Sequence, residues 1–242
     1  MADVGYCTVE DLRRALRAAD LPGDAAQDRE IAIDAITAQT EWLQEETNRH
    51  WYEPTGLDED TDGLIPTAPL VHESDEQDIS TGTIMFADEE ITPSTRIGSY
   101  TPVSLFRRDV TQLTELLVLN NAGGFDDWVA SSDHTEGRGE DYFLQVDDAD
   151  GWTTLYLDTE SLDDEDVTDY RNAVVATYEY GIEGTTKTVR RAVAMKAAAQ
   201  LLTDDETALG IPDNGNLVPA ESKLKALERQ AEELLGIHED SR

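Results

Sequence analysis

Lysine is nearly absent from this 242-residue chain, which carries 53 acidic residues against 18 basic ones. The lysines are Lys187, Lys196, Lys223 and Lys225. A formal charge of −35 excludes the basic surface that is typical of nucleic-acid binders. Acids spread along the whole chain are typical of proteins that live in high salt, because at about 1 M salt the Debye length is only about 3 Å. We therefore interpret most carboxylates as a halophilic surface, in preference to a surface that mimics DNA.

Cysteine and long apolar runs are scarce as well. Cys7 is the single cysteine, so no disulfide can form within the chain, which fits a reducing compartment. We expect Cys7 to act as a small buried hydrophobic residue. No apolar run approaches the roughly 18 residues of a membrane span. The N-terminus also lacks the basic region and apolar core of a signal peptide, so we expect no membrane partner.

Motifs for catalysis and for cofactor binding are missing. No histidine spacing supports a zinc site, and neither GxSxG nor GxxxxGK[ST] occurs. Asp58, Asp60 and Asp62 have the spacing of a calcium loop, but Pro69 stands where that loop needs a bidentate carboxylate. We interpret this segment as a solvated acidic loop. The sequence therefore predicts no enzyme, no metal site and no cofactor.

Hydrophobic periodicity predicts helices at both ends of the chain. Thr8 and Asp11 form a capping pattern at the start of the first one. The last one has Pro219 in its first turn and Gly236 just past its end. The predicted helices cover about 8–20, 24–49, 185–202 and 219–235.

The middle of the chain has a β-like pattern, roughly over residues 80–181. Strands are expected on both sides of the turns NNAGG and DDADG, and a long strand from Ala173 to Tyr180. Residues 50–95 contain no Lys or Arg and many acids, and we interpret them as a long loop with short strand fragments. The predicted class is α+β, a helical bundle of two N-terminal and two C-terminal helices with an inserted antiparallel β region. The predicted divisions are 1–52, 53–181 and 182–242.

One predicted helix contains no acid at all between Glu183 and Asp204. After its first turns nearly every position is apolar, which indicates a buried helix. Lys187, Arg190 and Arg191 cluster on one side of those first turns. Cations near a helix N-terminus face an unfavourable dipole. We therefore expect these bases to meet carboxylates of the same or an adjacent subunit.

The order of these segments resembles the head–tail connector (adaptor or head-completion) proteins of tailed viruses. In that family a T-x-E-x-L helix precedes a helix that ends in a T-G-R-x-F/Y-like turn, and a later strand ending in Y-x-x-G leads into a helix beginning near V-x-x-A-V. Here Asn48 replaces the glycine of the turn, and Asn also tolerates a positive φ. The family-motif residues are Trp42, Thr47, Arg49, Tyr52, Tyr178, Gly181, Val189, Ala192 and Val193.

The resemblance implies a structural virion protein at the head–tail junction, made in the host cytoplasm. Such adaptors form a ring of about twelve subunits beneath the portal. They receive the tail or neck protein and extend a channel through which DNA passes without sequence-specific binding. With the acidic surface, the resemblance implies a tailed virus of a halophilic archaeon.

Two groups of residues are candidates for subunit or portal contacts. The first is the basic group Lys187, Arg190 and Arg191. The second is an apolar seam near the C-terminus, formed by Leu224, Leu227, Ala231 and Leu234. Its 3-4-3 spacing fits either one partner helix or packing within its own subunit.

Two other functions remain as alternatives. A DNA-contacting protein could use the basic helix, but phosphate contacts weaken steeply at molar salt. A halophilic enzyme or ligand-binding module could place its site in the β region, with Trp128, Tyr142 and Trp152 as ligand platforms. Aromatic residues in short strands are more often core residues than platforms.

Overall fold

In the computed structural model the chain forms two compact units. The first contains residues 1–47, 51–69 and 182–242, and the second contains residues 48–50 and 70–181. The structure describes residues 5–17, 21, 25, 28–55, 64–77, 84–85, 99–120, 122–164, 173–204, 211–213 and 216–236.

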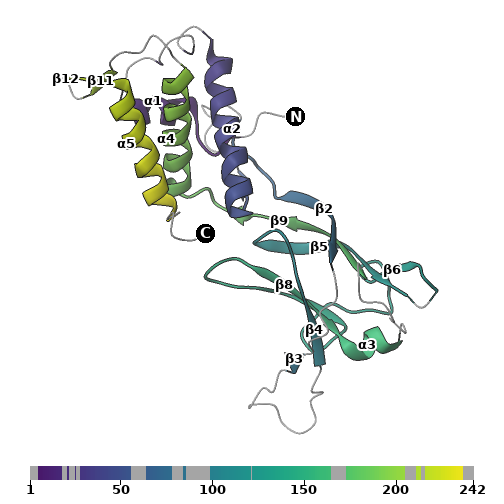
Figure 1. Cartoon of the computed structure of the whole chain (residues 1–242). Coiled ribbons are helices and arrows are strands. Elements are labelled where there is room, and N and C mark those ends of the chain that lie inside the picture. The colour runs from purple at the N-terminus through teal and green to yellow at the C-terminus, as the bar shows by residue number, and fades with distance from the viewer. Residues whose placement is uncertain are drawn as a thin grey trace. The chain divides into compact units, whose positions relative to one another are not determined.

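Four helices of the first unit contribute to one apolar core (Figure 1). They are α1 (Val9–Leu16), α2 (Arg29–Thr47), α4 (Lys187–Asp204) and α5 (Ala220–Leu235). Two short ladders accompany them. Strand β1 (Trp51–Tyr52) pairs in parallel with β10 (Ile182–Glu183), and β11 (Ile211–Asp213) pairs with β12 (Asn216–Val218).

Helix α1 begins at the predicted capping box. The backbone N–H of Asp11 donates to Thr8 Oγ1, and the backbone N–H of Thr8 donates to Asp11 Oδ2, both at 3.1 Å. Val9, Leu12 and Leu16 then bury one face of the helix. Cys7, just before the cap, is fully buried, which confirms its predicted role, and burial raises the pKa of its thiol.

Helix α4 is the central helix of the first unit, because α1, α2 and α5 all pack against it. Its alanines are almost completely buried, including Ala192, Ala197 and Ala198 at 0% exposure. Small side chains allow neighbouring helices to approach closely. The absence of acids from most of this segment is therefore explained by burial, as the sequence predicts.

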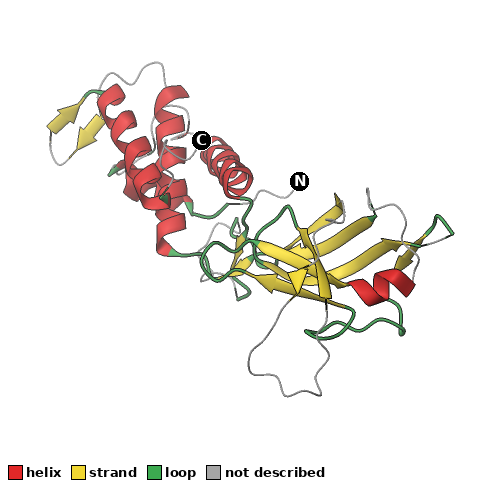
Figure 2. Ribbon diagram, turned by 60° about the horizontal axis from the view of Figure 1, so that its bottom comes forward, coloured by secondary structure: helices red, strands yellow, loops and turns green. Residues whose placement is uncertain are grey.

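Two four-stranded antiparallel sheets form most of the second unit (Figure 2). They have the strand orders β2-β9-β5-β6 and β3-β4-β8-β7, and both contribute to one apolar core. In β9, residues alternate between buried and half-buried along the strand, as expected for one face on a core. The strands are β2 (Leu70–Gln77), β3 (Ile84–Met85), β4 (Ser99–Ser104), β5 (Val110–Leu119), β6 (Phe125–Asp127), β7 (Tyr142–Val146), β8 (Thr153–Asp158) and β9 (Val174–Tyr180), and helix α3 (Thr159–Asp164) follows β8.

The predicted class, a helical bundle with an inserted antiparallel β region, is wrong. The described residues form five helices and twelve strands, arranged in three antiparallel sheets and one parallel ladder. The chain is therefore mixed α/β and rich in sheet. The largest omission is β2, whose eight residues LVHESDEQ lie in the segment interpreted as a loop. Acids at several of its positions hide the β pattern, and pairing with β9 decides its conformation.

Several local predictions are confirmed. Strands β5 and β6 pair across NNAGG, and β7 and β8 pair across DDADG.

Helix α2 begins at Arg29, later than predicted, and the short helix α3 was not predicted. The Asp58–Asp62 segment lies outside the described residues. None of the described helices is long and apolar enough to cross a bilayer.

Candidate functional site

The first unit contains a cavity of about 480 Å³ whose lining is rich in basic residues. Helices α1, α4 and α5 form its walls, with Ala15, Ala194, Met195 and Leu227 among the apolar lining residues. Its basic residues are Arg14, Arg17, Lys187, Arg190, Arg191 and Lys223, and its one acid is Asp11. Six of the 18 basic residues of the chain thus lie around one cavity, although the chain has a charge of −35. We call it the basic cavity.

Arg190 is the member of the basic group that meets a carboxylate within the chain. Its Nη2 donates to Asp11 Oδ2 at 2.7 Å, in a pair that is mostly shielded from solvent. Burial alone would raise the pKa of Asp11, but hydrogen bonds from Arg190 and Thr8 outweigh it and hold that pKa below its usual value. The expectation that Arg190 contacts a carboxylate is therefore confirmed, and the carboxylate belongs to the same chain.

Lys187 and Arg191 have no such partner. Both are exposed, and neither has an ion pair or a hydrogen bond from its side chain to any described residue. Both line the basic cavity. Sequence reasoning missed Arg14, Arg17 and Lys223, which come from α1 and α5. A periodicity pattern cannot show which faces of separate helices meet, so no signal in the sequence joined them to α4.

Lys196 lies on the far side of α4 in a different contact. Its Nζ is 3.0 Å from Glu232 Oε1 of α5 and 4.7 Å from the ring centroid of Trp42 on α2. The side chain thus links three helices by an ion pair and a cation–π contact. The role of Trp42 in the first unit is to pack against the core and to cover this ammonium group.

The apolar seam of α5 is covered within its own chain. Leu227 and Ala231 are 3% and 0% exposed, and Leu224 and Leu234 pack partly buried against the same core. Helix α5 lies along α4. The sequence leaves open whether this seam meets a partner helix or packs within its own subunit. In the structure it packs within its own subunit.

The turn that matches the family motif, residues 47–52, has both of its ends in the first unit. Thr47 Oγ1 donates to Leu43 O at 2.6 Å, which closes the last turn of α2. Tyr52 lies in β1, and its carbonyl accepts a hydrogen bond from Gly184 N at 2.8 Å. Two segments that are far apart in the sequence, one after α2 and one before α4, therefore run side by side.

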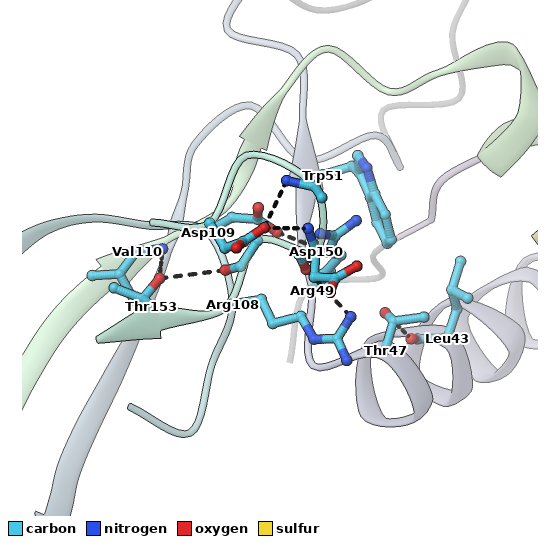
Figure 3. A network of polar contacts seen from close by, with 12 residues as sticks. Leu43, Thr47, Arg49, Trp51, Arg108, Asp109, Val110, Asp150 and Thr153 are labelled. Atoms are coloured by element: carbon cyan, nitrogen blue, oxygen red, sulfur yellow. Dashed lines mark hydrogen bonds and ion pairs between the residues drawn. The ribbon is translucent and has the colours of Figure 1, made fainter. Parts of the chain in front are cut away.

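The middle of that turn belongs to the second unit. Asn48 has φ +55°, so it occupies the left-handed conformation for which the family uses glycine. Arg49 Nε lies 3.1 Å from Asp109 Oδ2, and its guanidinium also donates to the carbonyl of Asp150 (Figure 3). Burial raises the pKa of Asp109, although Arg49 opposes this shift. Arg49 is thus a clamp between loops of the second unit.

Tyr178 and Gly181 support the same region. Tyr178 is fully buried, and its hydroxyl accepts a hydrogen bond from Arg107 N at 3.1 Å. Gly181 N donates to Asp109 O at 2.9 Å. Both residues have structural roles, and neither lines a described cavity.

A second cavity, of about 510 Å³, is acidic and lies in the second unit. Asp141 is its best-held carboxylate, with hydrogen bonds from Ser161 Oγ at 2.6 Å and Thr135 N at 2.7 Å. Burial would raise the pKa of Asp141, but these bonds outweigh it and lower the pKa. His134 Nδ1 is 3.9 Å from Asp141 Oδ1. Among the described residues, no group of three His, Cys, Asp or Glu side chains has the geometry to hold a metal ion.

The aromatic residues suggested as ligand platforms differ in exposure. Trp128 and Tyr142 are 0% and 4% exposed and belong to the core. Trp152 is 44% exposed, but the Arg108 guanidinium stacks over its ring at 4.1 Å. These three residues do not form a common platform.

Comparison with known proteins gave no relative, because no family model, no curated protein and no solved structure matches this chain.

Proposed function

We propose that this protein is a structural virion component of a tailed virus, a head–tail adaptor that forms a ring beneath the portal. The ring would join the capsid to the tail or neck and extend the channel through which DNA passes. The acidic composition fits a host cytoplasm of high salt.

One observation carries the proposal. The two segments that carry the family resemblance, the turn after α2 and the strand leading into α4, are hydrogen bonded to each other through β1 and β10. Trp51 lies opposite Ile182 and Tyr52 lies opposite Glu183. Each short motif is weak support when it is taken alone. Motifs that also contact each other in the fold give stronger support for a common origin with the adaptor family. The positive φ of Asn48, at the position of the family's glycine, agrees with this interpretation.

The buried interior of the first unit supports an architectural role. Its central helix contributes alanines to the core, and its tyrosine Tyr6 fastens the family-motif turn. The Tyr6 hydroxyl accepts hydrogen bonds from Gln44 Nε2 at 2.8 Å and from Trp51 N at 3.2 Å. These hydrogen bonds join the N-terminal segment to the end of α2 and to the start of β1.

The test is the mass and shape of the purified protein in molar KCl, measured by sedimentation velocity and electron microscopy. We expect a closed ring of about twelve copies, since head-to-tail contacts that close form cyclic assemblies. A wild-type protein that stays monomeric at every concentration contradicts the proposal.

A further inference from the structure

We propose that the basic cavity of the first unit binds carboxylates from a second copy of this chain. The inference rests on the proposed function, because it assigns one side of the contact by which neighbouring copies would form the ring. It also goes beyond that function, because it names the residues, the chemistry and the direction of the contact.

The first step is the charge of the cavity. Its six basic residues face a single acid, Asp11, whose carboxylate is already neutralised by Arg190 at 2.7 Å. Arg14 has further ion pairs within α1, 3.3 Å from Glu10 and 3.7 Å from Asp11. Among the lining residues, basic side chains therefore outnumber acidic ones by six to one, in a chain that is acidic overall.

The second step concerns Lys187 and Arg191, which no described group neutralises. Both lie in the first turns of α4, where the helix dipole opposes positive charge. This position is unfavourable for the isolated chain. An anion that enters the cavity would remove the repulsion and accept charge-assisted hydrogen bonds from both side chains.

The third step identifies the anion. A second copy of the chain carries 53 acidic side chains against 18 basic ones, so carboxylates are the charged groups that it supplies most often. Side chains can enter a cavity of about 480 Å³ between three helices, and the walls reduce screening of the pairs formed inside it. Nucleic acid is less suitable, because each phosphate contact lowers the affinity steeply as salt rises.

The fourth step is the symmetry of the contact. A basic cavity on one copy and carboxylates on a different face of the next copy make a heterologous contact. Such contacts repeat from copy to copy, and they produce rings when the rotation closes. A contact between this cavity and a different face of the next copy is therefore of the heterologous type from which rings are built.

The first experiment compares two double variants by sedimentation equilibrium in molar KCl. Lys187→Gln with Arg191→Gln removes the two unneutralised charges and keeps the Arg190–Asp11 pair. Lys225→Gln with Arg229→Gln removes two charges from α5 that do not line the cavity and that pair locally with Glu221 and Glu233. We expect self-association to weaken by roughly tenfold or more in the first variant and to stay unchanged in the second.

The second experiment needs no substitution, so it decides the question even where a variant fails to fold. A carbodiimide joins lysine amines to contacting carboxylates, and the chain has few lysines. In assemblies mixed from ¹⁵N-labelled and unlabelled copies, mass spectrometry should find Lys187 joined to an acidic peptide of the other copy. Lys225 should be joined within its own copy to Glu221, 2.7 Å away.

The outcomes separate the two proposals. Equal association of all variants, together with no Lys187 cross-link between copies, overturns the assignment of the cavity and leaves the adaptor ring standing. A small open oligomer that dissociates in the Lys187/Arg191 variant supports the cavity and contradicts the ring. A wild-type chain that never associates overturns both. Retention of the cross-link yield when duplex DNA is added excludes DNA as the occupant, and its loss would overturn the choice of carboxylate.

Discussion

The guanidinium of Arg190 lies 2.7 Å from the carboxylate of Asp11, and this pair joins the first turn of α4 to the first turn of α1. Asp11 has two functions at once. It completes the capping box of its own helix through Thr8, and it accepts a charged hydrogen bond from the central helix of the first unit. The chain therefore uses one of its many carboxylates to fix the start of two helices.

The Asp11→Asn variant should lose stability in a way that depends on pH. The folded-state pKa of Asp11 is lowered, so its ionised form stabilises the fold above the unfolded-state pKa of about 3.9. This contribution is lost as the pH falls through the folded-state value. We expect the variant to be less stable than wild type by about 1–3 kcal/mol near neutral pH. That difference should shrink below about pH 4.

Urea titrations in molar KCl at several pH values would measure this difference. Asp34→Asn, at an exposed position of α2, is the matched control and should leave the free energy of unfolding almost unchanged. A difference between wild type and Asp11→Asn that stays constant down to acid pH would contradict the assigned ion pair.

Lys196→Gln should destabilise the first unit. The substitution removes the ion pair to Glu232 and the cation–π contact with Trp42, and the ammonium group is largely shielded. Glu232 remains half exposed, so we expect a modest loss of about 1 kcal/mol. Thermal unfolding in molar KCl measures it. Lys225→Gln, which removes an exposed pair on α5, should leave the midpoint unchanged. Equal effects of the two substitutions would show that Lys196 has no special contact.

Gly151→Ala should destabilise the second unit more than Gly123→Ala does. The two glycines have nearly the same positive φ, +72° and +77°, so the cost of giving a side chain to a residue at positive φ is similar in both. At Gly151 a Cβ would collide with Asp109 and Arg49, whereas at Gly123 it would meet no atom of the described residues within 4 Å. We expect Gly123→Ala to cost about 1 kcal/mol and Gly151→Ala to cost at least about 2 kcal/mol more.

Denaturant unfolding followed by tryptophan fluorescence, to which Trp128 in the core of the second unit contributes, measures both losses. The comparison isolates the Arg49–Asp109 contact, because the backbone term cancels between the two variants. If they unfold at the same denaturant concentration, the close approach of Gly151 to this ion pair is not present in solution.

The sequence predicts local structure where a short pattern decides it. The Thr8–Asp11 capping box and the burial of α4 depend on residues within a few turns, and both are present. The hairpin across NNAGG follows from turn chemistry in the same way. Strand β2 was not predicted, because its partner, β9, lies about a hundred residues further along the chain. Only pairing with that partner makes so acidic a segment a strand.

The basic cavity likewise has a part that the sequence predicts and a part that depends on the tertiary fold. The basic group at the start of α4 is visible in the sequence, and its unusual position near a helix N-terminus suggested an interaction. Arg14, Arg17 and Lys223 join it only because α1 and α5 pack on α4. For the apolar seam of α5, the sequence predicts the buried face but not the partner that covers it. A 3-4-3 apolar spacing predicts that a face is covered, but the identity of the partner depends on the tertiary fold.

The stability of the whole chain should rise with KCl concentration. A charge of −35 produces self-repulsion that is screened as the Debye length falls from about 10 Å at 0.1 M to about 3 Å at 1 M salt. We expect Tm to rise steeply over this range and then to flatten, since the repulsion is nearly gone at the upper end. Sucrose is the control, because it favours compact states by exclusion from the protein surface without screening charge. A Tm that does not depend on KCl, or that rises as much in sucrose, would contradict the interpretation of the acidic surface as an adaptation to salt.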